Sequence, residues 1–308
     1  MSLHTSFIDF CSTITISNSK KDSILKSRNA IRNVIRDYFK NELKINQPKF
    51  RIQGSFSINT ALQPIDDNEV DIDDGLYLEH INPSDTDTWP TPKEIHKTLM
   101  NALNGQTKDG CEDKTSCVRV VYRNDYHVDI PVYIMKDSHA LLANKKTNEW
   151  QTSDSKDFKD WFFENRQNEQ TTRIVKYLKA WRDYKNINMA SIELTILAVQ
   201  HHVKDDNDAI SLQKTVEAIY SELNFFRYIK KPVAPYENLW DDKDDIDSVL
   251  KKIKQFKDDL ISAVSNDSEH RASVILRGQF GERFPLIKEI NNSDSLRNYE
   301  IGPKPWKM

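Results

Sequence analysis

The chain has 308 residues, of which 38% are hydrophobic and 30% are charged; this is typical of a globular protein in water, long enough for two lobes. Its 44 Lys and Arg residues nearly balance 47 Asp and Glu residues, and the net charge of −3 argues against a protein that mainly coats DNA or RNA, though not against small anionic substrates. With only 7 glycines the chain contains neither a GxGxxG nor a GxxxxGK[ST] loop, which excludes dinucleotide-binding and P-loop proteins of those types.

Cysteine usage and the apolar pattern bear on the compartment. Cys11, Cys111 and Cys117 are an odd number without a CxxC pair, which predicts neither a disulfide framework nor a structural zinc site and fits a reducing cytosol. The N-terminus has no basic region followed by an apolar stretch, and no apolar run approaches the length of a membrane span. We therefore expect a cytoplasmic protein without a membrane partner.

The first half of the chain is expected to combine helices with short strands. Apolar spacing predicts one long helix over residues 3–45 and another over 92–104, opened by Pro92. Alternation of apolar and polar residues predicts strands at 50–52, 70–78, 117–122 and 126–133. Asn124-Asp125 is a hairpin signal between the last two strands.

Beyond about residue 155 the strand signals stop. Helices are expected at 156–164, 169–184, 191–203, 209–223 and 244–264. The pattern therefore predicts an α/β lobe followed by a helical lobe, without repeats or low-complexity segments.

Gln53-Gly54-Ser55 follows the first expected strand and precedes residues that are able to begin a helix. Glycine lets a backbone pass close to a phosphate, and Ser55 with the following amides offers the hydrogen-bond donors that phosphate oxygens accept. The motif thus indicates a phosphate-binding turn, although a Gly-Ser pair before a helix is also an ordinary turn and cap.

Asp71-Ile72-Asp73 stands within the second expected strand. Side chains alternate along a strand, so both carboxylates share one face while Ile72 is buried on the other. Asp129 is a third strand carboxylate, flanked by apolar residues, and it joins the pair if its strand lies beside the first.

Three carboxylates on one patch repel one another unless a cation neutralises them, and all-oxygen ligation suits Mg²⁺. The arrangement is typical of two-metal phosphoryl transfer, in which one ion activates a hydroxyl and the other holds a triphosphate and the leaving pyrophosphate. We expect Asp71 and Asp73 to bind both ions, and Asp129 to bind the catalytic ion and help remove the hydroxyl proton. Each carboxylate alone is also compatible with a solvated or hydrogen-bonded surface position, but the three features in this order favour catalysis.

The combined pattern resembles the polymerase-β-type nucleotidyltransferases, and within them the cGAS/DncV-like nucleotidyltransferases (CD-NTases) of bacterial anti-phage CBASS systems. The resemblance rests on Gln53-Gly54-Ser55-Phe56 and Asp71-Ile72-Asp73-Asp74-Gly75, and on segments of the helical lobe at 177–182, 191–197, 232–239 and 279–286. Fifteen residues separate Ser55 from Asp71, more than is usual in the superfamily, and Asp74 stands where the wider family prefers an apolar residue. The DncV-like members share this Asp, so we interpret it as a subfamily feature.

This resemblance implies an α+β fold with a polymerase-β-like nucleotidyltransferase core, a mixed β-sheet, a long N-terminal helix and a C-terminal helical lobe. The implied domains are residues 1–160 for the core, including the N-terminal helix, and 161–308 for the helical nucleotide-binding lobe. Substrates are expected in the cleft between them.

The same resemblance implies a Mg²⁺-dependent enzyme that joins NTPs into a cyclic di- or trinucleotide second messenger for anti-phage defence and releases pyrophosphate. Its cofactor is expected to be two Mg²⁺ ions, with Mn²⁺ as a substitute. Its substrates are ATP and other NTPs, GTP among them, and a downstream effector is reached through the diffusible product. The near-neutral charge adds the expectation that no nucleic-acid activator is obligatory.

The resemblance also implies nucleotide contacts. Gln53, Gly54 and Ser55 belong to the nucleotide-binding motif, while Lys179 and Ser191 of the helical lobe are expected to reach the triphosphate. Lys176 remains the alternative to Lys179, because it lies three residues earlier on the same predicted helix, and a lysine there is otherwise a solvated one.

Three rival functions remain open. One is a synthase of linear oligonucleotides, and another is a transferase that modifies RNA or a protein. The third, from another class, is an inactive nucleotide-binding sensor, against which the three intact carboxylates argue.

Overall fold

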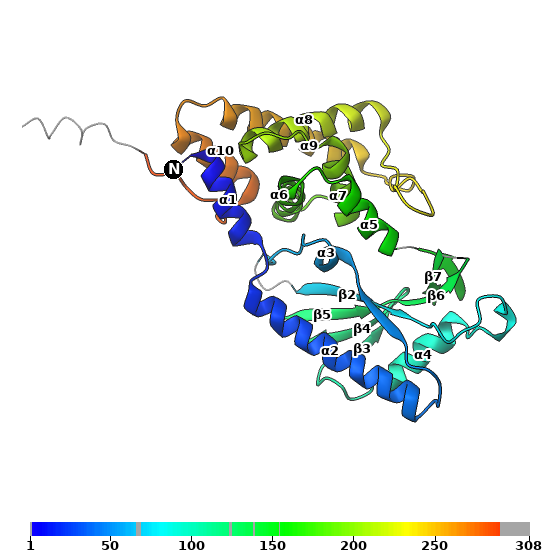
Figure 1. The fold of residues 1–308 in the computed structure, drawn as a ribbon. Helices are drawn as coiled ribbons and strands as arrows, with labels where there is room; N and C mark the ends of the chain where they lie inside the picture. The colour runs from blue at the N-terminus through cyan, green and yellow to red at the C-terminus, as the bar shows by residue number, and fades with distance from the viewer. Residues whose placement is uncertain (1, 66–68, 123–124, 138, 154, 290–308) are drawn as a thin grey trace, which may run out of the picture.

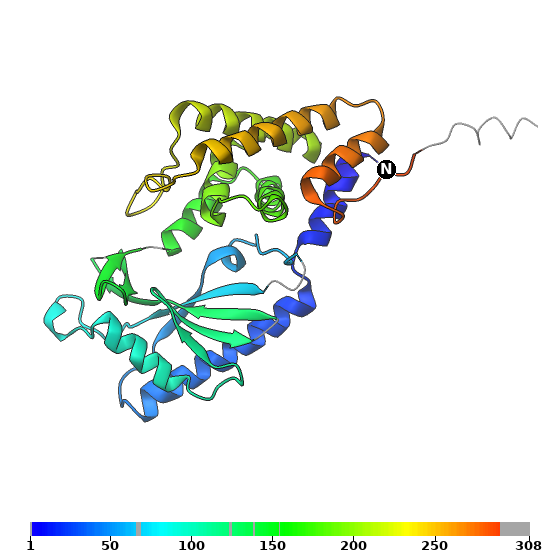
Figure 2. The same ribbon diagram turned by 180° about the vertical axis from the view of Figure 1, so that it is seen from behind.

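The computed structural model describes residues 2–65, 69–122, 125–137, 139–153 and 155–289. An α/β lobe and a helical lobe face each other, as Figures 1 and 2 show from opposite sides. The expected α+β class, with a mixed sheet and a C-terminal helical lobe, is confirmed. No helix among these residues is both long enough and apolar enough to cross a membrane.

The α/β lobe is built on an 8-stranded sheet in which β1 pairs with β2 outside the main path β3-β4-β5-β2-β6-β7-β8. Its strands are β1 (Lys49–Ile52), β2 (Val70–Tyr77), β3 (Cys111–Asp113), β4 (Val118–Tyr122), β5 (Tyr126–Ile130), β6 (Val132–Lys136), β7 (His139–Asn144) and β8 (Glu149–Thr152). β2 runs parallel to both β5 and β6, whereas the other pairs are antiparallel.

The strand expected at 126–133 is two strands, a correction caused by Pro131. Proline has no backbone N–H and cannot donate within a ladder. β5 therefore ends at Ile130, and the carbonyl of Pro131 still accepts a 2.8 Å hydrogen bond from the Leu76 N–H of β2. β4 and β5 form the expected hairpin, of whose turn Asn124 lies outside the described residues.

Two helices cover the sheet face that points away from the helical lobe (Figure 1). These are α2 (Asn18–Asn41) and α4 (Pro92–Ala102); the short α3 (Gly54–Ser57) and the 3₁₀ turn η1 (Thr86–Thr88) complete the lobe. Ile31 and Ile35 of α2 pack into the same core as Ile72 of β2. Burial of each such side chain contributes about 1.5–3 kcal/mol of folding free energy, and this packing holds the helices against the sheet.

The helical lobe has its own core. It contains α1 (Leu3–Ile14), α5 (Ser155–Asn165), α6 (Glu169–Lys185), α7 (Ser191–His201), α8 (Asp208–Phe226), α9 (Ile246–Val264) and α10 (Glu269–Phe280). The core includes closely packed aromatic rings, with Trp181 stacked on Phe256 at 4.6 Å between ring centroids and Phe10 against Phe280 at 4.8 Å. α10 and the strands β3, β7 and β8 were not expected from the sequence.

The single N-terminal helix expected over residues 3–45 is wrong. The chain is extended at Thr15, and the Ser17 side chain caps a new helix by accepting a hydrogen bond from the Lys20 N–H. α1 packs Phe7 and Phe10 into the helical core, whereas α2 packs against the sheet. The chain therefore crosses between the lobes at residues 15–17. The division at about residue 160 stays a prediction, but α1 lies with the helical lobe.

Candidate active site

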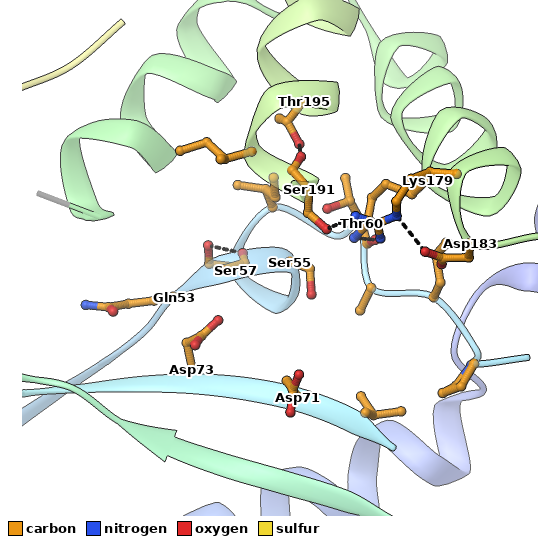
Figure 3. Close-up of a pocket in the computed structure, with 18 of the residues that line it drawn as sticks. Gln53, Ser55, Ser57, Thr60, Asp71, Asp73, Lys179, Asp183, Ser191 and Thr195 are labelled. Carbon is orange, nitrogen blue, oxygen red and sulfur yellow. Dashed lines mark hydrogen bonds and ion pairs between the residues drawn. The ribbon is translucent and has the colours of Figure 1, made fainter. Parts of the chain in front are cut away.

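A cleft of about 1050 Å³ lies between the two lobes. Its floor is the face of β2 and β5 that carries carboxylates, and its opposite wall comes from α6 and α7 (Figure 3). All eight residues expected in the site line it: Gln53, Gly54, Ser55, Asp71, Asp73, Asp129, Lys179 and Ser191. The structure thus gathers residues that are up to about 140 positions apart in the sequence.

The strand geometry brings the three carboxylates together. Asp71 and Asp73 project from the same face of β2 toward α3, while Ile72 is fully buried on the other face (Figure 3). β5 lies directly beside β2, and Asp73 is in register with Asp129. The expected adjacency of the two strands is therefore present in the fold.

Burial and mutual repulsion both act on the carboxylates of this cluster. Burial, followed by the charges of Asp129 and Asp71, raises the pKa of Asp73 to about 6. Arg119 of β4 opposes the repulsion: its guanidinium donates to both oxygens of Asp129, at 2.7 and 2.8 Å, and lies 3.4 Å from Asp71. Sequence reasoning missed Arg119, because one arginine on an alternating strand gives no pattern by itself.

Whether a divalent cation fits here depends on the donors. In the described part of the chain, no three His, Cys, Asp or Glu side chains are grouped closely enough to hold a metal ion, and Arg119 occupies Asp129. The donor set itself suits a hard cation, because the carboxylate oxygens of Asp71, Asp73 and Asp129 line the same face of the cleft. The residues fit Mg²⁺ in their chemistry.

Gly54 is required by a close approach to the carboxylates. A Cβ at this position would lie 2.1 Å from Oδ2 of Asp73, and the backbone φ of +59° is one that L-residues rarely adopt. The turn at Gly54-Ser55 and the acidic cluster are therefore packed directly against each other. Ser55, the next residue, lines the cleft from the first turn of α3.

The side chain of Gln53 makes hydrogen bonds within the α/β lobe. Its amide donates to the Tyr77 hydroxyl at 3.1 Å and its carbonyl accepts from the Tyr133 hydroxyl at 3.1 Å, and the side chain is buried. These bonds tie the turn before α3 to β2 and β6. A direct contact of Gln53 with nucleotide stays a prediction.

The two candidate lysines of α6 differ in position. Lys179 lines the cleft and donates a 2.8 Å hydrogen bond to the Thr60 carbonyl; burial, with the charge of Arg182 second, lowers its pKa to about 8. Lys176 instead donates to the Thr15 hydroxyl at 3.0 Å, outside the set of cleft residues. The geometry favours Lys179 for a triphosphate.

Ser191 opens α7 at the cleft wall, and its hydroxyl accepts a 3.2 Å hydrogen bond from Arg182. Arg182 and Lys231 are further cations that line the cleft and were not selected from the sequence. Both stand next to or inside the segments of resemblance at 177–182 and 232–239, so the signal was present but unassigned.

Asp74 points to a different environment from its neighbours. It is 1% exposed and accepts hydrogen bonds from Nε of Arg32 at 2.6 Å and from a second guanidinium nitrogen at 2.5 Å. This pair links β2 to α2. The acidic residue at a position that is usually apolar therefore has a structural partner.

Comparison with known proteins agrees with this geometry. Residues 48–133 match the family model described as "Cyclic GMP-AMP synthase DncV-like, nucleotidyltransferase domain". A c-di-GMP synthase from Roseivirga ehrenbergii is 27% identical over 300 residues, which cover 81% of this chain and 76% of that protein.

Solved structures give the same fold. The Vibrio cholerae DncV cyclic AMP-GMP synthase in complex with the linear intermediate 5′ pppA(3′,5′)pG superposes with a TM-score of 0.75 at 20% identity, covering 89% of this chain and 93% of that one. The apo form of Vibrio cholerae DncV gives a TM-score of 0.76 at 19% identity, covering 92% and 96%. Residues 48–133 are therefore similar to a DncV-like nucleotidyltransferase domain, and the chain shares the fold of Vibrio cholerae DncV.

Proposed function

We propose that this protein joins two or three NTPs into a cyclic oligonucleotide, with release of pyrophosphate at each bond, in a reaction that depends on Mg²⁺ or Mn²⁺. The observation that carries the proposal is the register of Asp73 with Asp129, on parallel strands that also place Asp71 beside them. The c-di-GMP synthase and the cyclic AMP-GMP synthase among the similar proteins support a cyclic product.

The chemical step is an in-line substitution at phosphorus. A ribose hydroxyl oxygen forms a bond to the α-phosphorus of an NTP, the bond to the pyrophosphate oxygen breaks, and the hydroxyl proton leaves. In this proposal Asp129 accepts that proton or orients the hydroxyl. Its two oxygens also accept hydrogen bonds from Arg119, so it would have to share them between the two groups. A second transfer closes a ring of two nucleotides, and a third transfer closes a ring of three.

Asp71, Asp73 and Asp129 would hold the divalent cations, as their all-oxygen chemistry suggests. When bound, such ions neutralise the triphosphate and make a hydroxyl a better nucleophile. The remaining work belongs to the chain. Gly54 and Ser55 line the cleft. Ser55 faces Lys179 and Ser191 across it (Figure 3), so these residues would contact the phosphates from two sides.

The decisive experiment incubates the purified protein with the four NTPs and Mg²⁺, without nucleic acid, and analyses the products by mass spectrometry before and after phosphatase treatment. We expect a product that contains one phosphate per nucleoside and resists phosphatase, because a ring has no terminal phosphate. Asp73→Asn, run in parallel, should give none.

Each rival predicts another result. A phosphatase-sensitive oligomer with a 5′-triphosphate identifies a linear synthase. Transfer only after addition of RNA or protein identifies a modifying transferase. Absence of any product with either Mg²⁺ or Mn²⁺, despite nucleotide binding, identifies an inactive sensor.

The anti-phage role is a separate part of the proposal, and it rests on the resemblance to the CD-NTases. A second messenger acts through an effector that binds the diffusible product. The efficiency of plating of phage should therefore be lower on cells that carry the gene in its genomic context than on the same cells with Asp71→Asn. Equal plating with active enzyme in both would remove this part alone.

A further inference from the structure

The segment that follows α3 is held by the helical lobe, although its sequence belongs to the α/β lobe. Residues 58–63 connect α3 to the approach to β2, and Ile58 is part of the helical core. The Thr60 N–H donates a 2.9 Å hydrogen bond to the Ser55 carbonyl, so the segment is tied directly to the turn that lines the cleft.

Two of its carbonyls accept hydrogen bonds from cations of the helical lobe. Lys179 donates to the Thr60 carbonyl at 2.8 Å, and Arg283 donates to the Gln63 carbonyl at 2.9 Å. The Gln63 N–H in turn donates to the Ile14 carbonyl at 2.7 Å, at the end of α1. α6, the turn after α10 and the end of α1 therefore all contact residues 58–63.

A bound nucleotide would affect the hydrogen bonds of Lys179 and Arg283 differently. Lys179 lines the cleft and, in the proposed function, moves its ammonium toward a triphosphate, which removes or weakens the bond to Thr60. Arg283 is half-buried and does not belong to the cleft lining. Its bond to Gln63 is therefore available whether or not a nucleotide is bound.

Local structure fixes where Arg283 points. α10 ends at Phe280, and its C-cap Gly281, with a φ of +74°, turns the chain; the Phe284 N–H donates back to the Gly281 carbonyl at 3.2 Å. Phe284 is fully buried, with its ring 5.0 Å from Phe7 and 5.7 Å from Phe280 between centroids. A tight turn that is anchored on both sides leaves the arginine little freedom.

We propose that Arg283 is a positioning residue for the nucleotidyl-transfer site: from outside the cleft it holds residues 58–63, and through them Ser55 and α3, when Lys179 engages the nucleotide. The consequence for turnover rests on the proposed function, whereas the consequence for the mobility of the segment does not. A charge-assisted bond to a backbone carbonyl is strong enough for this role.

The test compares Arg283→Ala and Arg283→Lys with Arg277→Ala. Arg277 is a matched control on α10, because its contact is a 3.8 Å approach to Glu282, which is 98% exposed. The first measurement is amide hydrogen exchange of peptides that cover residues 54–63, in the full-length protein. We expect exchange there to accelerate about tenfold in Arg283→Ala, less in Arg283→Lys, and not in Arg277→Ala.

The second measurement is steady-state kinetics with NTPs. We expect kcat/KM to fall about tenfold in Arg283→Ala, mainly through KM, with partial recovery in Arg283→Lys. Unchanged exchange at 54–63 in a folded Arg283→Ala overturns the proposal, and so does an equal effect of Arg277→Ala. If Arg283→Ala does not fold, Arg283→Met, which keeps the side-chain bulk but has no donor, takes its place, and wild-type exchange at 54–63 in that folded variant overturns the proposal as well. A wild-type protein without transferase activity defeats the proposed function and leaves the exchange result valid.

Discussion

Two aspartates, the half-buried Asp73 of the α/β lobe and the buried Asp208 of the helical lobe, have pKa values shifted in opposite directions. Asp208 in the helical lobe is 0% exposed and accepts hydrogen bonds from Arg173 at 2.6 and 2.8 Å, from Gln170 at 2.8 Å and from Tyr177 at 2.9 Å. Burial alone would raise its pKa, but these bonds outweigh burial and the pKa is lowered. Asp73 in the cleft has no such donors among the described residues to offset desolvation: burial first, and the charges of Asp129 and Asp71 second, raise its pKa to about 6.

The contrast distinguishes a charge that stabilises the fold from a charge that serves chemistry. A fully hydrogen-bonded carboxylate such as Asp208 ties α6 to α8 and has no capacity left for a ligand. A carboxylate that is kept among other carboxylates costs folding free energy and is useful only when a cation arrives. Four predictions test this distinction, in order of decreasing effect.

Asp71→Asn or Asp73→Asn is expected to reduce turnover by at least about 10³-fold, equivalent to roughly 4 kcal/mol of transition-state stabilisation, because either change removes a cation ligand. The measurement is pyrophosphate release at saturating NTP. Thermal unfolding serves as the control and should show no loss of stability, since a repelling charge is removed. Product formation close to the wild-type rate would contradict the assignment of the cluster.

Asp208→Asn is expected to lower the free energy of unfolding by about 3–5 kcal/mol, because it leaves the Arg173 guanidinium without its carboxylate. Urea unfolding measures the change, and kcat of the remaining folded enzyme should stay near the wild-type value. A variant of wild-type stability would show that the polar cluster around Asp208 is not a structural device.

The pH dependence of stability should have opposite signs at the two aspartates. The folded pKa of Asp73, about 6, lies above its unfolded value of 3.8, so in metal-free buffer ionised Asp73 destabilises the fold. Asp73→Asn should match the wild type below about pH 4 and exceed it by roughly 2–3 kcal/mol above about pH 6. For Asp208, whose folded pKa is lowered, the stabilisation is present above pH 3.8 and is lost as the pH falls below it. Unfolding curves from pH 3 to 8 measure both; a constant difference for Asp73→Asn would contradict the raised pKa.

Lys179→Met is expected to lower kcat/KM for NTP by about ten- to a hundredfold, or roughly 1.5–3 kcal/mol, through loss of one charge-assisted bond to the triphosphate. Stability should not fall, because burial already lowers the pKa of this lysine and so disfavours its charged form. Lys176→Met is the matched control, since Lys176 contacts Thr15 instead. A larger effect at Lys176 would mean that the helix presents the other lysine to the nucleotide.

Local rules were sufficient to predict the acidic cluster. Alternation along a strand puts Asp71 and Asp73 on one face whatever the rest of the fold does, and apolar flanks mark Asp129 as a residue of an interior strand. The helices of the C-terminal half follow from apolar spacing, because each presents one face to a common core. These features depend on neighbours in sequence, which a single sequence displays.

What could not be predicted depends on partners distant in sequence. The apolar spacing of residues 3–45 is continuous, and only the cap at Ser17 signals that Phe7 and Ile24 belong to different cores. Arg119 became recognisable only when β4 was placed beside β5. β7, which includes the helix-favouring residues Ala140 and Leu141, forms a strand because β6 and β8 flank it; here tertiary pairing overrides local preference.

The break between α1 and α2 has a mechanical consequence. The backbone passes from one lobe to the other at residues 15–17 and again just before α5, and the α1–α2 junction and the start of α5 lie on opposite sides of the structure (Figure 1). Two lobes that are joined by two covalent connections rotate most readily about the axis that passes through both connections. Thr15 pairs with Leu62, so the segment that Lys179 and Arg283 hold lies almost on that axis. Any rotation of one lobe against the other about that axis would displace residues 58–63 least, so this end of the cleft would keep its contacts.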